Sequence, residues 1–366
     1  MRRIRFALFI FAVMLLFTQL SPIQAQDSFD RHAMLENLVD NVILTGYESF
    51  IEEAVALETL ILQFSENPTE DNLLLVQDAW RETSNAWEEV SMYGIGLRLM
   101  SLHNQVDKRP VNVDLINRLL DNAETVDETF VSNIGSTQKG LPAIEYYIFD
   151  SEGDNQAVID NLTANPQLMD FVLALSQYLP TTGEDILRLW SPDGDNFTEE
   201  FINADGAGGD AQASINILVN EMFAAFEMIL DDRLGDPAGI TGEGEANPAL
   251  VDAPYSQHSL ARIEHNLIGL QRLFTGGDGA GFDDYLDFLG AEAEEQMLSS
   301  LINDRFDAAL ESLNTIDEPL QFAIVNQPDA VQLLYDDIRM VYIPIRVDMA
   351  SQLSILVTFS DADGDG

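Results

Sequence analysis

The chain has 366 residues, of which 63 are acidic and 17 basic, and its formal net charge is −46 at pH 7. Such a charge repels nucleic acid and anionic lipid, so it excludes a nucleic-acid-binding function and favours a cationic partner. The chain contains no cysteine, which excludes disulfides, thiolate metal sites and a lipid-anchored cysteine. The acidity does not identify a site, because the solubility of a protein in salty surroundings is the favoured explanation for it.

The first 25 residues have the pattern of an export signal. Three arginines stand within the first five residues, residues 6–17 form an apolar core, and Ala25 ends a suitable cleavage site. The apolar run is short for a membrane span, and we expect no transmembrane segment later in the chain. We therefore predict that residues 1–25 are removed and that the mature protein is soluble in the periplasm or at the cell exterior.

Apolar residues recur at helical spacing through most of the remaining chain. Thr69 is expected to cap one helix, and Trp80 and Trp87, seven residues apart on one face of it, are expected in the core. No sustained β-type alternation occurs between turn signals, so we predict an all-α fold. The predicted helices span residues 34–64, 72–93, 113–130, 157–179, 184–190, 211–232, 255–274, 291–316 and 329–359.

The mature chain exceeds the length of a typical single domain, and Pro-, Asp- and Gly-rich stretches at 191–195 and 205–210 mark the expected boundary. We predict two helical-bundle domains packed side by side, an N-terminal bundle at 31–195 and a C-terminal bundle at 210–359. A short acidic tail at 360–366 follows them. It begins like a calcium loop, but the chain stops before the acidic residue that would complete one.

The most informative stretch surrounds Gly140 and Glu145. Gly140 suits the loop before a helix, and Pro142 suits the first helical turn, where a missing N–H costs nothing. The segment that follows carries a single charge, Glu145, among apolar and aromatic residues. Such a carboxylate either meets a cation or several donors, or bonds back to free N–H groups as a helix cap. The residues alone leave both interpretations open.

Residues 140–145, GLPAIE, resemble the glycine-x-histidine-x-x-glutamate signature of the imelysin family. Pro142 stands where that signature has histidine, so a metal site built on the histidine lacks a ligand here. A partial match between GLPAIE and residues 259–264, SLARIE, is a weak sign of internal duplication. Further segments resemble imelysins in the family's order, so the resemblance covers about residues 33–365; these segments are 79–96, 233–239, 281–286 and 348–365.

The resemblance implies candidate site residues and two classes of function. Gly140 and Glu145 are the candidate ligand-binding residues and Glu145 the candidate metal ligand, while no catalytic residue is identified. The favoured function is a cell-envelope binding protein for a small cationic ligand or metal, acting in iron acquisition, with envelope partners open. The alternatives are an imelysin-type metallopeptidase and a structural or interaction protein of the envelope that has no metal site.

The chemistry of the side chains favours binding over catalysis. No His-Glu-x-x-His helix is present, and the four histidines are scattered, so a catalytic zinc is hard to build. His258 and His265, seven residues apart, could share a helix face, but a core or solvent position is favoured. The abundant oxygen ligands suit a divalent cation or ferric iron better than zinc.

Overall fold

The computed structural model describes residues 28–203, 211–241 and 244–357. Three predicted segments lie outside the described residues: the signal peptide at 1–25, the glycine-rich stretch at 205–210 and the acidic tail at 360–366. From Arg31 onward the chain groups as one compact unit.

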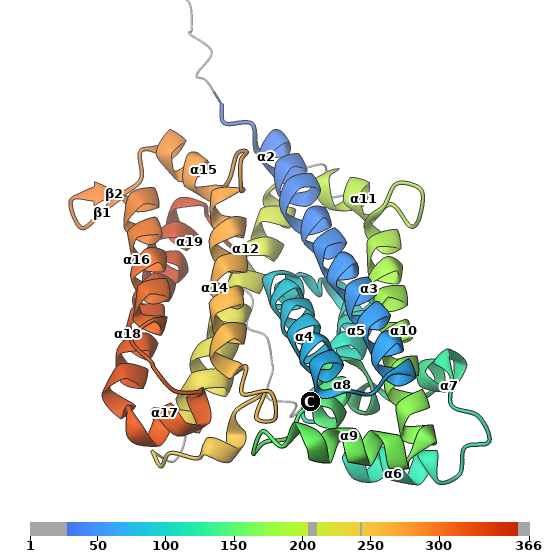
Figure 1. Cartoon of the computed structure of the whole chain (residues 1–366). Coiled ribbons are helices and arrows are strands. Elements are labelled where there is room, and N and C mark those ends of the chain that lie inside the picture. The colour runs from blue at the N-terminus through green and yellow to red at the C-terminus, as the bar shows by residue number, and fades with distance from the viewer. Residues whose placement is uncertain (1–27, 204–210, 242–243, 358–366) are drawn as a thin grey trace, which may run out of the picture. The chain divides into compact units, whose positions relative to one another are not determined.

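The described secondary structure is almost entirely helical, which confirms the predicted all-α fold (Figure 1). The helices are α2 Arg31–Leu38, α3 Thr45–Glu66, α4 Glu70–Val90, α5 Gly96–Val106, α6 Val113–Leu120, α7 Glu128–Asn133, α8 Gly140–Ile148, α9 Asn155–Ala164, α10 Pro166–Trp190, α11 Phe197–Asn203, α12 Gln212–Glu227, α13 Asp236–Ala238, α14 Ser259–Thr275, α15 Phe282–Leu289, α16 Leu298–Leu313, α17 Leu320–Asn326, α18 Pro328–Pro344 and α19 Ala350–Gln352. The remaining elements are π-helical turns at Val39–Leu44, Met228–Gly235 and Ile345–Met349, 3-10 turns at Ser91–Tyr93, Ser136–Gln138 and Pro248–Leu250, and a hairpin of β1 Glu292–Ala293 and β2 Gln296–Met297.

Local capping explains where predicted helices are confirmed and where they are interrupted. Thr69 caps α4 as predicted, because its hydroxyl accepts a 3.4 Å hydrogen bond from the backbone N–H of Asn72. The segment predicted as one helix at 113–130 is instead α6 and α7. The side chain of Asp127 accepts a 2.9 Å bond from a backbone N–H and so starts a second helix within that segment. Pro166 likewise begins α10, which divides the helix predicted at 157–179.

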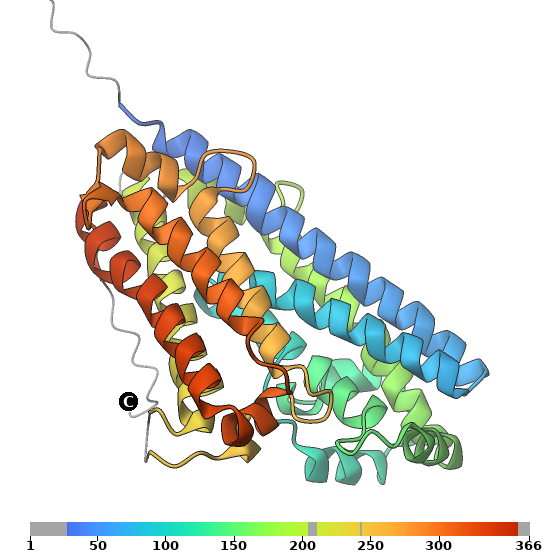
Figure 2. The same ribbon diagram turned by 60° about the vertical axis from the view of Figure 1, so that its left-hand side comes forward.

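Long helices form the frame in which the motif sits. In the first half, α3 packs against both α4 and α10, and in the second half α16 packs against α18. The helix α14 packs along α4 and so joins the two halves, as the two views in Figures 1 and 2 show. Trp80 and Trp87 are both buried on α4, which confirms their predicted place in the core. The division into two bundles near residues 195–210 and the internal duplication remain predictions.

One described stretch, Gln212–Ala238, is long and apolar enough to cross a membrane by length and composition alone. Its most apolar window has a mean hydropathy of 1.4, and 56% of that window is buried within the protein. No such stretch is expected after the signal peptide from the sequence. For these residues the absence of a transmembrane segment therefore remains a prediction.

Candidate functional site

Gly140 begins α8 with a φ angle of +76°. A Cβ atom there would lie 2.1 Å from the carbonyl oxygen of Val106 and 2.6 Å from that of Gln105. Both oxygens belong to the backbone at the end of α5, so only glycine fits unless that helix moves. The glycine of the motif therefore sets how closely α8 approaches the chain after α5, where Asp107 and Arg109 lie.

Pro142 lies buried near the start of α8, where proline is tolerated because its missing N–H would have no helical partner. Its side chain offers neither a donor nor a lone pair, so it supplies no ligand where the imelysin signature has histidine. The adjacent carbonyl oxygen of Leu141 accepts a 3.0 Å hydrogen bond from Trp80 Nε1. This bond attaches the motif helix to α4.

The carboxylate of Glu145 is 1% exposed, and the polar groups around it come from distant segments. Its Oε1 atom accepts hydrogen bonds of 3.1 Å from the backbone N–H and 2.8 Å from the hydroxyl of Ser256. Its Oε2 atom lies 2.6 Å from Nη1 of Arg109. These bonds favour the interpretation in which Glu145 meets a cation and several donors over the one in which it caps its own helix.

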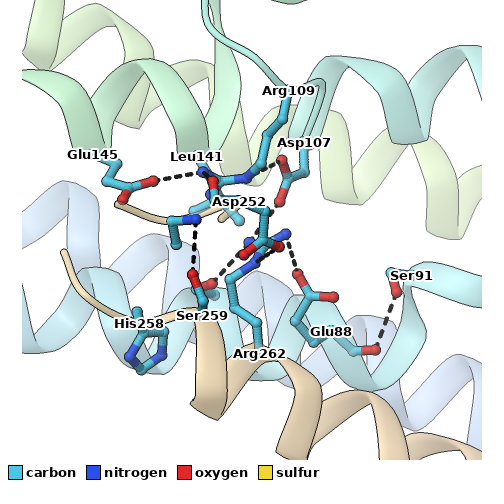
Figure 3. A network of polar contacts seen from close by, with 12 residues as sticks. Glu88, Ser91, Asp107, Arg109, Leu141, Glu145, Asp252, His258, Ser259 and Arg262 are labelled. Carbon is cyan, nitrogen blue, oxygen red and sulfur yellow. Dashed lines mark hydrogen bonds and ion pairs between the residues drawn. The ribbon is translucent and has the colours of Figure 1, made fainter. Parts of the chain in front are cut away.

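Arg109 links Glu145 to the rest of the site (Figure 3). Its Nε atom lies 3.0 Å from Oδ1 of Asp107, and its Nη1 atom donates to Glu145 and to the backbone carbonyl of Asp252. Its Nη2 atom is buried and has no hydrogen-bond partner within the described part of the chain. A guanidinium can donate two parallel bonds to one carboxylate, so Arg109 uses only part of its capacity.

Arg262, on α14, is the most buried cation of the site, with 1% of its side chain exposed. Its three nitrogens lie 2.7 Å from Glu88 Oε1, 2.8 Å from Asp107 Oδ2 and 2.9 Å from Asp252 Oδ2. Arg233 reaches two of these carboxylates, at 2.8 Å from Glu88 Oε2 and 3.4 Å from Asp252 Oδ2. We call the seven residues together the ion-pair cluster: Glu88, Asp107, Arg109, Glu145, Arg233, Asp252 and Arg262.

The electrostatics of the ion-pair cluster follow from burial and pairing. Burial acts to raise the pKa of Asp107 and of Asp252, but the neighbouring arginines outweigh it and hold both pKa values below the usual range. Burial and Arg262 act to lower the pKa of Arg109, and the carboxylates around it outweigh both and raise it. These groups therefore stay charged, and each depends on the others because an unpaired buried charge is costly.

His258 and His265, for which a core or solvent position was favoured over a shared site, bond to different partners. His258 Nε2 lies 2.7 Å from Asn85 Oδ1, whereas His265 Nδ1 lies 3.0 Å from Glu89 Oε1 on the more exposed side of α14. Burial and the nearby Arg262 lower the pKa of His258 to about 3, so its ring is neutral at physiological pH. No group of three or more His, Asp or Glu residues suited to a metal ion occurs among the residues that the structure describes.

Of the site residues described above, Gly140 and Glu145 were predicted from the sequence, whereas the other members of the ion-pair cluster were not. For Arg262 a usable signal was present, because basic residues are scarce in this chain and an arginine within an apolar helix therefore stands out. Arg262 precedes the buried Ile263 on α14, and its paired negative charges come from α4 and from the chain after α5. The role of Glu145 as a metal ligand remains a prediction.

The fold and the site define an all-helical protein in which a glycine-started helix presents one buried glutamate to a cluster of arginines and carboxylates. The family model described as Imelysin matches residues 43–339 of the chain. The protein belongs to the imelysin family.

Individual relatives agree with this assignment. The chain is 19% identical to iron-regulated protein A of Synechococcus elongatus over 311 residues, which cover 82% of this chain and 80% of the relative. It has the fold of a putative iron-regulated protein A precursor from Parabacteroides distasonis, with a TM-score of 0.72, 17% identity, and coverage of 92% and 97% of the two chains. An imelysin-like protein from Psychrobacter arcticum also has a TM-score of 0.72, at 18% identity and 90% and 97% coverage.

The contact between Gly140 and α5 can be tested by adding one methyl group. Gly140→Ala is expected to lower the free energy of unfolding by at least about 3 kcal/mol, because backbone strain and a clash add together. Gly153 is the matched control, since its φ is +78° but nothing lies within 4 Å of its Cβ position. Gly153→Ala should cost about 1 kcal/mol, from strain alone. Equal losses for the two variants in urea unfolding would contradict the close approach.

The ion-pair cluster predicts a pH-dependent effect of Asp252→Asn. At pH 7 the variant should lose about 3 kcal/mol of stability, because Arg262 and Arg233 lose a paired charge. Because the pKa of Asp252 is lowered in the folded state, its ionised carboxylate stabilises the folded protein at any pH above the unfolded-state pKa of about 3.9. This stabilisation is lost progressively as the pH falls below about 3.9. The difference from wild type should therefore stay constant from pH 7 to about pH 5 and shrink as the pH falls below about 4 in urea unfolding. The exposed Asp193→Asn serves as the control, and a difference for Asp252→Asn that is independent of pH would refute the assignment.

Proposed function

We propose that the protein is an exported cell-envelope protein that binds a cation-bearing ligand in an iron-linked role. In this proposal Glu145 is the carboxylate that meets the positive charge of the ligand. The relatives named above support the link to iron, because two of them carry the name iron-regulated protein A and this chain shares their fold or sequence. The acidic surface supports it too, since a net charge of −46 raises the local concentration of cations.

The observation that carries the proposal is the environment of Glu145. Its carboxylate is 1% exposed and is matched to a single positive group, Arg109, which arrives from a different segment. A buried carboxylate is costly without a cation, so this position is built to hold one positive charge. The cluster is more exposed at Arg109 and Asp252, each 15% exposed, so a ligand would approach Glu145 from that side.

The donor set indicates that the cation arrives with its own ligands. A bare hard cation needs about six oxygens, whereas Glu145 has an arginine beside it and belongs to no metal-suited group among the described residues. Residues near Glu145 therefore do not fit a resident metal ion. A cation already held by a small chelator needs only one further oxygen, which Glu145 can supply.

A metallopeptidase role has less support. Catalytic zinc sites use three protein ligands and keep one position open. Pro142 supplies no ligand, and within the described ranges Glu145 has Arg109 and Ser256 as its side-chain partners. Binding is therefore the function that the geometry favours.

Export can be tested by amino-terminal sequencing of the protein recovered from the cell envelope. The mature chain is expected to begin at or near Gln26, as the basic start and apolar core of the first 25 residues require. The word precursor in the name of the Parabacteroides distasonis protein supports processing in that relative. An intact Met1 on a membrane-embedded product would refute export.

Ligand binding at Glu145 can be tested by thermal melts with ferric citrate as the probe. At a hundred times the dissociation constant, ferric citrate should raise the melting temperature of the wild type by about 5 °C. Glu145→Gln should lose most of this shift, because the amide cannot replace the charge that the cation meets. The matched control is Glu89→Gln, which alters a carboxylate paired outside the ion-pair cluster. Equal shifts in wild type and Glu145→Gln would place any cation on the acidic surface instead.

A further inference from the structure

We infer that Arg109 and Ser256 form a cradle for a carboxylate of the ligand, and that Glu145 occupies this cradle until the ligand replaces it. The inference rests on the proposed function and specifies its ligand class: a metal chelate whose chelator carries carboxylates and whose cation can accept one more oxygen. Binding is then an exchange of partners. The ligand carboxylate takes Arg109 and Ser256, and Glu145 turns to the cation.

The donors around Glu145 are those of a carboxylate-binding site. Two come from Ser256, whose backbone N–H and hydroxyl both bond to Glu145 Oε1 at 3.1 and 2.8 Å. The third is Arg109 Nη1, at 2.6 Å from Oε2. Charged donors and a backbone N–H together hold a carboxylate strongly. They would hold the carboxylate of a small molecule by the same bonds.

The unpartnered nitrogen of Arg109 indicates that Glu145 fills the cradle incompletely. Nη2 is buried and lacks a hydrogen-bond partner within residues 28–203, 211–241 and 244–357, although Nη1 beside it makes two bonds. A buried donor without an acceptor is destabilising. A free carboxylate can bond to Nη1 and Nη2 in parallel, which the tethered side chain of Glu145 does not do here. The ligand therefore gains a bond that the internal carboxylate lacks.

Charge balance makes the exchange feasible and selective. When a carboxylate of the ligand replaces Glu145 at Arg109, the guanidinium keeps a negative partner and Glu145 gains the cation. No buried charge is left unpaired, which is the condition for moving charges inside a protein without a large cost. A metal-free polycarboxylate lacks the cation for Glu145 and is also repelled by the net charge of −46. The site should therefore prefer the metal-loaded form.

The segment that carries Ser256 is held in place by contacts that do not involve the Glu145 carboxylate. The rings of Tyr255 and Tyr146, the neighbours of Ser256 and Glu145, meet edge to face with centroids 5.1 Å apart. Gln321 holds the same segment through a 3.3 Å bond to the carbonyl oxygen of Pro254. Both contacts leave the Ser256 donors in place while Glu145 turns away.

Calorimetric titration with metal-free citrate and with ferric citrate tests the inference. Wild type should bind ferric citrate at least about a hundredfold more tightly than metal-free citrate, because only the former offers Glu145 a cation. In Glu145→Gln the internal competitor loses its charge, so metal-free citrate should bind about threefold more tightly than in wild type. The preference for the metal should disappear, so ferric citrate should bind at least about thirtyfold more weakly than in wild type. Glu89→Gln should behave like wild type in both titrations.

The cradle itself is tested by Arg109→Gln and Ser256→Ala. Each variant should bind metal-free citrate and ferric citrate about tenfold or more weakly than wild type does. Arg272→Gln, outside the ion-pair cluster, should bind both as wild type does. If Arg109→Gln does not fold, Ser256→Ala still tests the cradle. It removes only one hydroxyl from a loop, so this variant is expected to fold.

The outcomes separate the two proposals. A ferric citrate signal that disappears in Glu145→Gln, without tighter binding of metal-free citrate, keeps the proposed function and overturns the exchange. Unchanged citrate binding in Ser256→Ala and Arg109→Gln would also overturn the cradle. Equal ferric citrate binding in wild type and Glu145→Gln overturns the proposed function at this site.

Discussion

The ion pair between Arg109 and Glu145 is the contact through which the motif helix joins the rest of the site. Burying either charge alone would cost several kcal/mol, so the two segments that carry them must remain together. Gly140 makes the pair possible, because its lack of a Cβ lets α8 lie against the end of α5, one to four residues before Asp107 and Arg109. A backbone constraint thus determines where the charges meet.

The other charges extend this constraint across the molecule. Arg262 on α14 binds Glu88 on α4 and Asp107 after α5, so the helix packing between the two halves and the ion pairs require the same geometry. Buried ion pairs contribute little net stability compared with apolar packing, but they disfavour alternative arrangements, because each misplaced charge would be unpaired. We therefore assign a structural role to the buried carboxylates and arginines: they fix the positions of Arg109 and Glu145 rather than add to overall stability.

The sequence predicted the fold class and one member of the site, for reasons that can be traced to particular residues. Apolar spacing at 3.6 residues marks helices such as α4, and Thr69 gives its start, because these signals are local. Glu145 stood out as a lone charge in an apolar helix. Its partners could not be predicted, because Arg109 lies 36 residues and Ser256 lies 111 residues away along the chain, and only the packing of helices brings them together. The interruption of the helix predicted at 113–130 was missed because a cap at Asp127 outweighs the apolar spacing.

The most direct measurement of the central claim is a crystal structure of the protein with ferric citrate, with the iron located by its anomalous scattering. The account predicts iron beside Glu145, a citrate carboxylate bonded to Arg109 and Ser256, and the loss of the 2.6 Å contact between Arg109 Nη1 and Glu145 Oε2. An intact Arg109–Glu145 pair, with iron bound only at acidic side chains on the surface, would contradict it.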